Sequence, residues 1–220
     1  MSKVLVTGGS GFIGTAIVSL LKKKGFTVHV LDLWDVEVEG ITNFKGSVLN
    51  VDDIDKAIEG CEYVVHLAAI LGVAKSTHMP VECLDVNIMG LRNVLQACVQ
   101  HKVKKILFTS SSEVYGEPEK TPVSEDMLLQ PKSEYGVSKV VGEEYLKAYA
   151  KQYGLKYSIV RFFNVYGVGQ AHSWVMPRFA NFAVLGRPIT LYGDGQQVRA
   201  FCHVDDAARG AVKKTASKPQ

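Results

Sequence analysis

The stretch Thr7-Gly8-Gly9-Ser10-Gly11-Phe12-Ile13-Gly14 directly follows the apolar run Val4-Leu5-Val6 and decides the fold of this chain. Gly8, Gly11 and Gly14 have the spacing G-x-x-G-x-x-G, a variant of the dinucleotide-binding fingerprint. In that fingerprint one glycine permits a tight turn, one lets the backbone approach a diphosphate, and one lets the helix pack closely on the strand. The N–H groups at the helix N-terminus then face the phosphates. The stretch therefore predicts a strand, a turn around a diphosphate and a helix.

The residues after the glycines indicate which dinucleotide is bound. Apolar residues recur at helical spacing as far as Leu21, and the predicted helix ends at Lys22-Lys23-Lys24-Gly25. The next predicted strand runs over residues 27–31 and ends at Asp32. An acidic residue about 20 positions after the glycines suits the ribose hydroxyls of NAD and repels the extra phosphate of NADP. The sequence therefore predicts NAD as the cofactor.

Apolar strands and amphipathic helices alternate along the rest of the chain. We expect strands at residues 62–67, 105–109 and 157–162, and helices at 52–58, 81–101 and 134–153. Continuous apolar strands separated by helices indicate a parallel sheet that is covered on both faces. The predicted fold is α/β, a Rossmann-like doubly wound parallel sheet with part of a small substrate domain. The predicted division is an NAD-binding domain at residues 1–166 and a partial substrate-binding region at 167–220.

Composition excludes several other classes of protein. The 220 residues carry a net charge of +3 with both signs interspersed, so we expect no nucleic-acid partner. The four cysteines (Cys61, Cys83, Cys98 and Cys202) form no C-x-x-C pair, so neither a metal site nor a disulfide framework is predicted. No apolar run approaches the length of a membrane span, and we expect no membrane partner. Met1-Ser2-Lys3 leads straight into the first strand with no signal peptide, which predicts a cytoplasmic location.

A second motif, far downstream, points to chemistry. Tyr135 and Lys139 are one helical turn apart, and Ser110-Ser111-Ser112-Glu113 ends the preceding strand. A tyrosine has an ordinary pKa near ~10, and a neighbouring ammonium and a positive nicotinamide ring favour its ionised form. A serine hydroxyl from the strand end can bridge to the same substrate oxygen. The pattern predicts an enzyme that moves a proton and a hydride at a hydroxyl-bearing carbon.

These motifs, taken in order, resemble the extended short-chain dehydrogenase/reductase family. The likeness is to its NAD-dependent sugar-nucleotide epimerase and dehydratase branch, which includes proteins similar to UDP-glucose 4-epimerase. The segments that carry the resemblance cover nearly the whole chain; they are residues 7–14, 66–69, 87–90, 110–116, 135–139, 161–167 and 193–199.

The resemblance implies a role for each matching residue. Tyr135 is expected to be the base, Lys139 to bind the nicotinamide ribose as well, and Ser111 to face the reacting oxygen of the sugar. Glu113 completes the candidate catalytic set. Asn164 and Arg199 are expected to contact the diphosphate of a nucleotide-diphosphate sugar substrate. The expected NAD-binding residues are Gly8, Gly11, Phe12, Ile13, Gly14, Asp32, Val48, Leu67, Ala68, Ala69, Tyr135, Lys139 and Phe162. The family often forms dimers through two long helices, here 81–101 and 134–153, so a homodimer is expected.

Some positions depart from the family pattern. Ser47 stands where an aspartate usually contacts the adenine, Ala74 replaces a common arginine, and Ala200 replaces a common aspartate. Proteins of this family continue well beyond residue 206, whereas this sequence reaches Gln220 in a polar tail. We therefore expect the chain to stop just as a new helix would begin, either as a truncated form or as a naturally short member.

Three functions remain open from the sequence. The first is a sugar-nucleotide 4-epimerase that oxidises and re-reduces the sugar at C4. The second is a decarboxylase or 4,6-dehydratase that begins with the same oxidation and uses Glu113 as an acid or base, since family members of that kind carry an acidic residue there. The third is a non-catalytic NAD-binding scaffold or sensor, which the short C-terminal part suggests and the intact Ser111, Tyr135 and Lys139 oppose.

Overall fold

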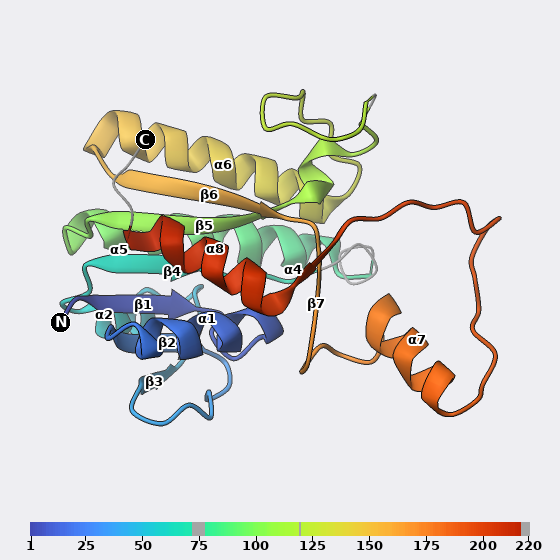
Figure 1. Cartoon of the computed structure of the whole chain (residues 1–220). Coiled ribbons are helices and arrows are strands. Elements are labelled where there is room, and N and C mark those ends of the chain that lie inside the picture. Colours follow the sequence, from blue (N-terminus) through green and yellow to red (C-terminus); the bar gives the residue numbers. More distant parts are fainter. Residues whose placement is uncertain (72–77, 119, 217–220) are drawn as a thin grey trace.

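The structure is a computed structural model that describes residues 1–71, 78–118 and 120–216, and its centre is a six-stranded parallel sheet (Figure 1). The strand order is β3-β2-β1-β4-β5-β6, which confirms the predicted doubly wound α/β fold. The strands are β1 (Lys3–Thr7), β2 (Thr27–Asp32), β3 (Thr42–Lys45), β4 (Tyr63–His66), β5 (Lys105–Ser111) and β6 (Lys156–Phe162).

Helices cover both faces of this sheet. Helices α1 (Phe12–Lys23) and α8 (Val204–Ala216) pack on one face, and α2 (Val51–Ile58), α5 (Gly90–Gln100) and α6 (Glu134–Tyr153) pack on the other. The helical segment predicted at 81–101 consists of α4 (Pro80–Leu84), a single π-helical turn (η1, Asp85–Met89) and α5. A 3₁₀ turn, η2 (Ser112–Tyr115), follows β5 directly.

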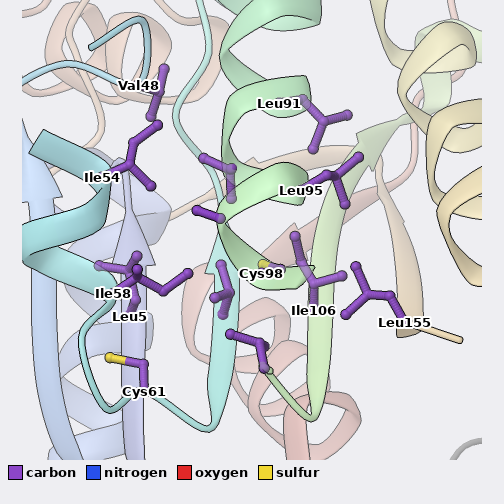
Figure 2. Close-up of a cluster of buried hydrophobic side chains, with 14 of the residues drawn as sticks. Leu5, Val48, Ile54, Ile58, Cys61, Leu91, Leu95, Cys98, Ile106 and Leu155 are labelled. Atoms are coloured by element: carbon purple, nitrogen blue, oxygen red, sulfur yellow. The ribbon is translucent and has the colours of Figure 1, made fainter. Parts of the chain in front are cut away.

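The larger apolar core lies between the sheet and the layer formed by α2, α5 and α6 (Figure 2). Leu5 of β1 and Ile106 of β5 meet Ile54, Leu91 and Leu95 of the helices, and all five side chains are fully buried. Each such side chain contributes about 1.5–3 kcal/mol by leaving water. This packing holds the carboxyl ends of the strands at one edge of the sheet, where ligands of doubly wound folds bind.

Strand β3 is present in the structure but was not expected from the sequence. It is an edge strand of four residues, and Phe44 is its only side chain that packs against the core. Such a strand shows too little apolar periodicity to be recognised, because it buries almost nothing.

The expectation that the chain stops just as a new helix would begin is wrong. Residues 204–216 form α8, which packs against α1 and buries Ala208, Ala211 and Val212 in the core on that face. The sequence pattern resembles a polar tail here, since alanines next to lysines give a weak apolar signal.

A second, smaller group of elements leaves the sheet after β6. Strands β7 (Asn164–Tyr166) and β8 (Phe201–His203) form a two-stranded parallel sheet, and α7 (Val175–Val184) lies between them in sequence. Helix α7 has no buried residue and stands away from the main sheet (Figure 1). The predicted division between residues 166 and 167 stays a prediction, and α8, on its C-terminal side, packs on the main sheet.

The described residues contain neither a membrane-spanning helix nor a metal-binding cluster. None of the helices in the described ranges is long and apolar enough to cross a membrane. In the same ranges no group of three or more His, Cys, Asp or Glu side chains is arranged to hold a metal ion.

Candidate active site

The turn between β1 and α1 is built from glycines that have different neighbours. Gly8 has a φ of +75°, a left-handed conformation that favours glycine, and a Cβ placed there would lie 2.5 Å from the backbone nitrogen of Ala68. A Cβ on Gly14 would collide with the carbonyl oxygen of Gly8. These two glycines therefore permit the turn and the close approach of the helix, two of the three functions expected from the fingerprint.

Gly11 differs because the space that a Cβ would occupy there is open. A Cβ on Gly11 would touch only the carbonyl oxygen of Gly8, at 3.4 Å, among the described atoms. Gly11 is the N-cap of α1, and no side chain caps this helix end. Phe12 and Ile13 form the first turn of α1 and are half-buried. Free N–H groups beside an open glycine suit a diphosphate, so these residues fit that part of NAD.

Asp32 lies at the carboxyl end of β2, beside the same turn. Its Oδ2 accepts a hydrogen bond from the Ser10 backbone N–H at 2.9 Å, and its Oδ1 accepts one from the Trp34 N–H at 3.3 Å. The carboxylate is half-buried, and each oxygen keeps lone pairs for the hydroxyls of a ribose. Its negative charge next to the glycine turn opposes a further phosphate at that point.

The residues expected to line the rest of the cofactor site follow the next strands. Leu67, Ala68 and Ala69 come directly after β4 and are half-buried. Val48, in the loop after β3, is almost fully buried against Gly90, whose missing side chain leaves room for it. Ser47 donates its backbone N–H to Asp53, and Ala74 lies outside the described residues.

Ser111 and Tyr135 come together at the carboxyl end of β5. Tyr135, in the first turn of α6, lies close enough to the Ser111 side chain for the serine hydroxyl to act on its pKa, and both residues are buried. Burial raises the pKa of Tyr135 to about 12; the Ser111 hydroxyl opposes this rise and the nearby charge of Glu113 adds to it. The tertiary structure therefore brings together the hydroxyls of Ser111 and Tyr135, as the sequence motifs predicted.

Lys139 lies beside Tyr135 on the same face of α6. Its Nζ donates to the Thr109 carbonyl oxygen at 2.9 Å and lies 5.6 Å from the centre of the Tyr135 ring. Burial lowers the pKa of Lys139 to about 8. Burial is the largest cause of the pKa shift in both groups, so the lowering of the Tyr135 pKa by Lys139 stays a prediction.

Glu113 lies in η2 and its side chain is exposed. Its backbone N–H donates to Ser111 Oγ at 3.2 Å, so Glu113 is fixed next to the serine by the main chain. After burial, the negative charge of its carboxylate is a smaller cause that raises the pKa of Tyr135.

The two expected substrate residues lie outside the main sheet. Asn164 is exposed in β7 and donates from Nδ2 to the carbonyl oxygen of Ala200 at 3.0 Å. Arg199 is also exposed and donates only to the neighbouring Val198 carbonyl oxygen among the described residues. Phe162, at the end of β6, is half-buried between the core on the α1 and α8 face of the sheet and the small cluster around Val165. The hydrogen bond to Ala200 thus places Asn164 of β7 near Arg199, which lies in the segment just before β8.

Sequence reasoning gave no role to two residues that shape the site. Gly9 lies under Val30, and a Cβ there would come within 2.6 Å of the Val30 side chain. Asn87, in the π-helical turn, accepts from the Ile70 N–H at 2.8 Å and donates to the Ser138 hydroxyl at 3.0 Å, which ties the chain after β4 to α6. Asn87 could have been found as the polar residue of the segment 87–90.

The fold and this site define a Rossmann-type dinucleotide-binding protein with a tyrosine, a lysine and a serine at the carboxyl edge of its sheet. The chain belongs to the NAD dependent epimerase/dehydratase family, whose model matches residues 4–218. NAD is the cofactor of that family, and its members are enzymes.

The relatives include two kinds of enzyme. A Methanocaldococcus jannaschii protein described as a putative UDP-glucose 4-epimerase is 38% identical over 216 residues, which cover 94% of this chain and 71% of that protein. A Bacillus cytotoxicus UDP-N-acetyl-alpha-D-glucosaminuronate decarboxylase is 35% identical, over 96% of this chain and 70% of its own length.

The solved structures agree with the sequence relatives. The UDP-N-acetylglucosamine 4-epimerase of Methanobrevibacter ruminantium, in complex with UDP-N-acetylmuramic acid, superposes with a TM-score of 0.93. The two chains are 33% identical, and the match covers 99% of this chain and 74% of that one.

Proposed function

We propose that this protein is an NAD-dependent 4-epimerase of a UDP-sugar. The observation that carries the proposal is that the Ser111 and Tyr135 side chains are buried next to each other at the carboxyl end of β5. This pair presents two hydroxyls to one substrate oxygen. The similarity to proteins described as UDP-sugar 4-epimerases supports the choice of reaction.

Each polar residue of the site then has a defined task. NAD, when bound, supplies a hydride acceptor and donor for C4 of the sugar. Tyr135, in the ionised form that Lys139 and a positive nicotinamide ring would favour, accepts the proton of the 4-hydroxyl during oxidation and returns it during reduction, while Ser111 holds the same oxygen. The keto sugar turns in the site, so that the hydride returns to the opposite face. Gly11 and the first turn of α1 hold the cofactor diphosphate, Asp32 the ribose, and Asn164 and Arg199 the substrate diphosphate.

A decarboxylase or 4,6-dehydratase stays as the second candidate because of Glu113. Its carboxylate is close enough to affect the pKa of Tyr135, and one relative is described as a decarboxylase. A carboxylate at this point can act as an acid or base after the oxidation at C4. We rank this candidate second because the Glu113 side chain is exposed.

A product assay tests the proposed reaction. We expect the protein, with NAD and UDP-glucose, UDP-N-acetylglucosamine or UDP-glucuronic acid, to form from at least one of them an isomer of unchanged mass. Chromatography with mass spectrometry measures this. A product lighter by carbon dioxide or water would replace the epimerase with the second candidate, and no turnover of any sugar nucleotide would favour a non-catalytic NAD-binding protein.

The exchange of Glu113 for Thr separates the two enzymatic candidates. We expect Glu113→Thr to keep a kcat close to that of the unchanged protein, because epimerisation needs no second acid or base. If Glu113 works after the oxidation, the same change costs about 10²–10⁴ in rate. Reduced cofactor would then accumulate without product, and its absorbance measures this outcome. Glu117→Thr is the control, since Glu117 is an exposed carboxylate of the same loop that pairs with Lys132.

The proposal includes a homodimer through α6 and the helical segment 81–101, which comprises α4, η1 and α5. Tyr153 of α6 and Met89, just before α5, are large exposed side chains on these elements. Light scattering of the purified protein measures the mass, and a monomer at micromolar concentration would contradict a dimer. The cytoplasmic location stays a prediction.

A further inference from the structure

A buried ion pair lies directly behind the candidate catalytic residues. Glu143 is on the same face of α6 as Tyr135 and Lys139, because the three residues follow one another at intervals of four. Its side chain is 1% exposed. Arg161 of β6 donates from Nε and Nη2 to its two oxygens at 2.9 and 2.6 Å, and Ser110 Oγ donates to Oε1 at 2.7 Å.

Arg161 also reaches to the opposite side of the site. Its Nη1 donates to the hydroxyl of Tyr115 at 2.7 Å and to the carbonyl oxygen of Glu125 at 3.0 Å. The guanidinium lies over the Tyr115 ring, 5.0 Å from its centre. Arg161 therefore joins α6 to η2 and to the loop that follows η2.

These contacts surround the segment that carries Ser111 and Glu113. Ser110, held by Glu143, directly precedes Ser111, and Tyr115, held by Arg161, ends the η2 turn in which Glu113 lies. Tyr135 and Glu143 share one rigid helix. The network thus connects the phenol to both ends of the segment 110–115, although none of its members touches the reacting oxygen.

Both partners carry charge in this network. Burial raises the pKa of Glu143, but the hydrogen bonds from Arg161 and Ser110 outweigh it, so the net shift is downward. The hydrogen bonds to Glu143 raise the pKa of Arg161. A buried ion pair is by itself weak evidence for a gain in stability, because removal of two charges from water costs about as much as their attraction returns. A role in geometry explains better why the pair and its partners connect α6, β6, β5, η2 and the loop after η2.

We propose that Glu143 and Arg161 are positioning residues that fix Ser111 and the η2 turn relative to Tyr135. The inference rests on the proposed function, since it assumes that Ser111 and Tyr135 act on one substrate oxygen. An error of about 1 Å in such an alignment can cost 10²-fold in rate. The pair therefore affects kcat more than the binding of substrate or cofactor.

Removal of one hydroxyl tests the proposal with little risk to folding. Tyr115→Phe deletes one of the two acceptors of Arg161 Nη1 and leaves the Glu143–Arg161 pair intact. We expect kcat to fall about tenfold, with KM for the sugar nucleotide and affinity for NAD within about twofold. Tyr149→Phe is the matched control, because Tyr149 is also buried and its hydroxyl bonds only to Gln96, away from the site, among the described residues. A kcat equal to that of the unchanged protein, or an equal loss in the control, would overturn the proposal.

A second variant replaces the guanidinium group of Arg161. Arg161→Lys keeps the charge beside Glu143 but cannot bond at once to two carboxylate oxygens and Tyr115. We expect a fall in kcat of about 10²-fold in this variant. If Arg161→Lys lost only stability, with kcat unchanged in the folded fraction, the pair would be structural and the proposal wrong.

Amide hydrogen exchange tests the positioning role of Glu143 and Arg161 independently of the proposed function. In Tyr115→Phe and Arg161→Lys we expect the amides of residues 111–116 to exchange several-fold faster, while those of 146–153 exchange as before. This result needs no turnover. If the unchanged protein converts no sugar nucleotide, the proposed function fails, and the exchange data alone decide the positioning role. Faster exchange in both segments, or in neither, would overturn it.

Discussion

Tyr135→Phe is expected to lower kcat for sugar-nucleotide conversion by about 10²–10⁴ while NAD binds almost as tightly as before. The change removes only the phenol oxygen, which lies beside Ser111 and, in the proposed mechanism, exchanges the proton with the 4-hydroxyl. The ring remains, so the packing at the start of α6 remains as well. Steady-state kinetics and a titration with NAD measure the two effects.

The control for this variant is Tyr145→Phe, which removes a phenol oxygen from the same helix. Tyr145 is partly buried against the core, and its ring makes a tilted contact with that of Tyr149. We expect Tyr145→Phe to keep its kcat. If Tyr135→Phe retained most of its activity, Tyr135 would not be the base and the proposed mechanism would be wrong. Lys139→Ala should weaken both turnover and cofactor binding, because Lys139 is expected to hold the nicotinamide ribose.

Two alanine substitutions in the glycine turn are expected to affect different properties. Gly14→Ala should lower the stability of the protein, and Gly11→Ala should weaken the binding of NAD. Gly14→Ala should lower the free energy of unfolding by about 3 kcal/mol in the absence of NAD, because its Cβ meets backbone atoms of Gly8 and Gly9 that cannot give way. Gly11→Ala should change that free energy by no more than about 0.5 kcal/mol, because its Cβ enters open space and its φ of −69° suits alanine. Denaturant unfolding of the protein without NAD measures both changes.

Cofactor affinity then distinguishes the two positions. We expect Gly11→Ala to weaken NAD binding about tenfold or more, because the added methyl group occupies the space assigned to the diphosphate. Isothermal titration of the folded protein measures this loss. Unchanged NAD affinity in Gly11→Ala, together with normal stability, would place the diphosphate elsewhere.

The local parts of the site could be predicted from the sequence. The glycine turn, the strand–helix alternation and the interval between Tyr135 and Lys139 are properties of residues close together in the chain. The limits of α6 agree with the predicted helix 134–153, because Ser133 caps its start and Gly154 ends it in a left-handed conformation. The sequence also indicated NAD, which the family confirms.

What the tertiary structure alone decided depends on residues far apart in the chain. Burial of the Tyr135 phenol, which sets the direction of its pKa, comes from packing that no local pattern describes. The same holds for Arg161, whose partners Glu143, Tyr115 and Glu125 lie on three other segments. Short, exposed β3 and alanine-rich α8 lacked a local signal because their places are set by the neighbouring β2 and α1. Spacing along the chain fixes which groups are one turn or one strand apart, whereas contact between segments fixes their distances, their burial and hence their chemistry.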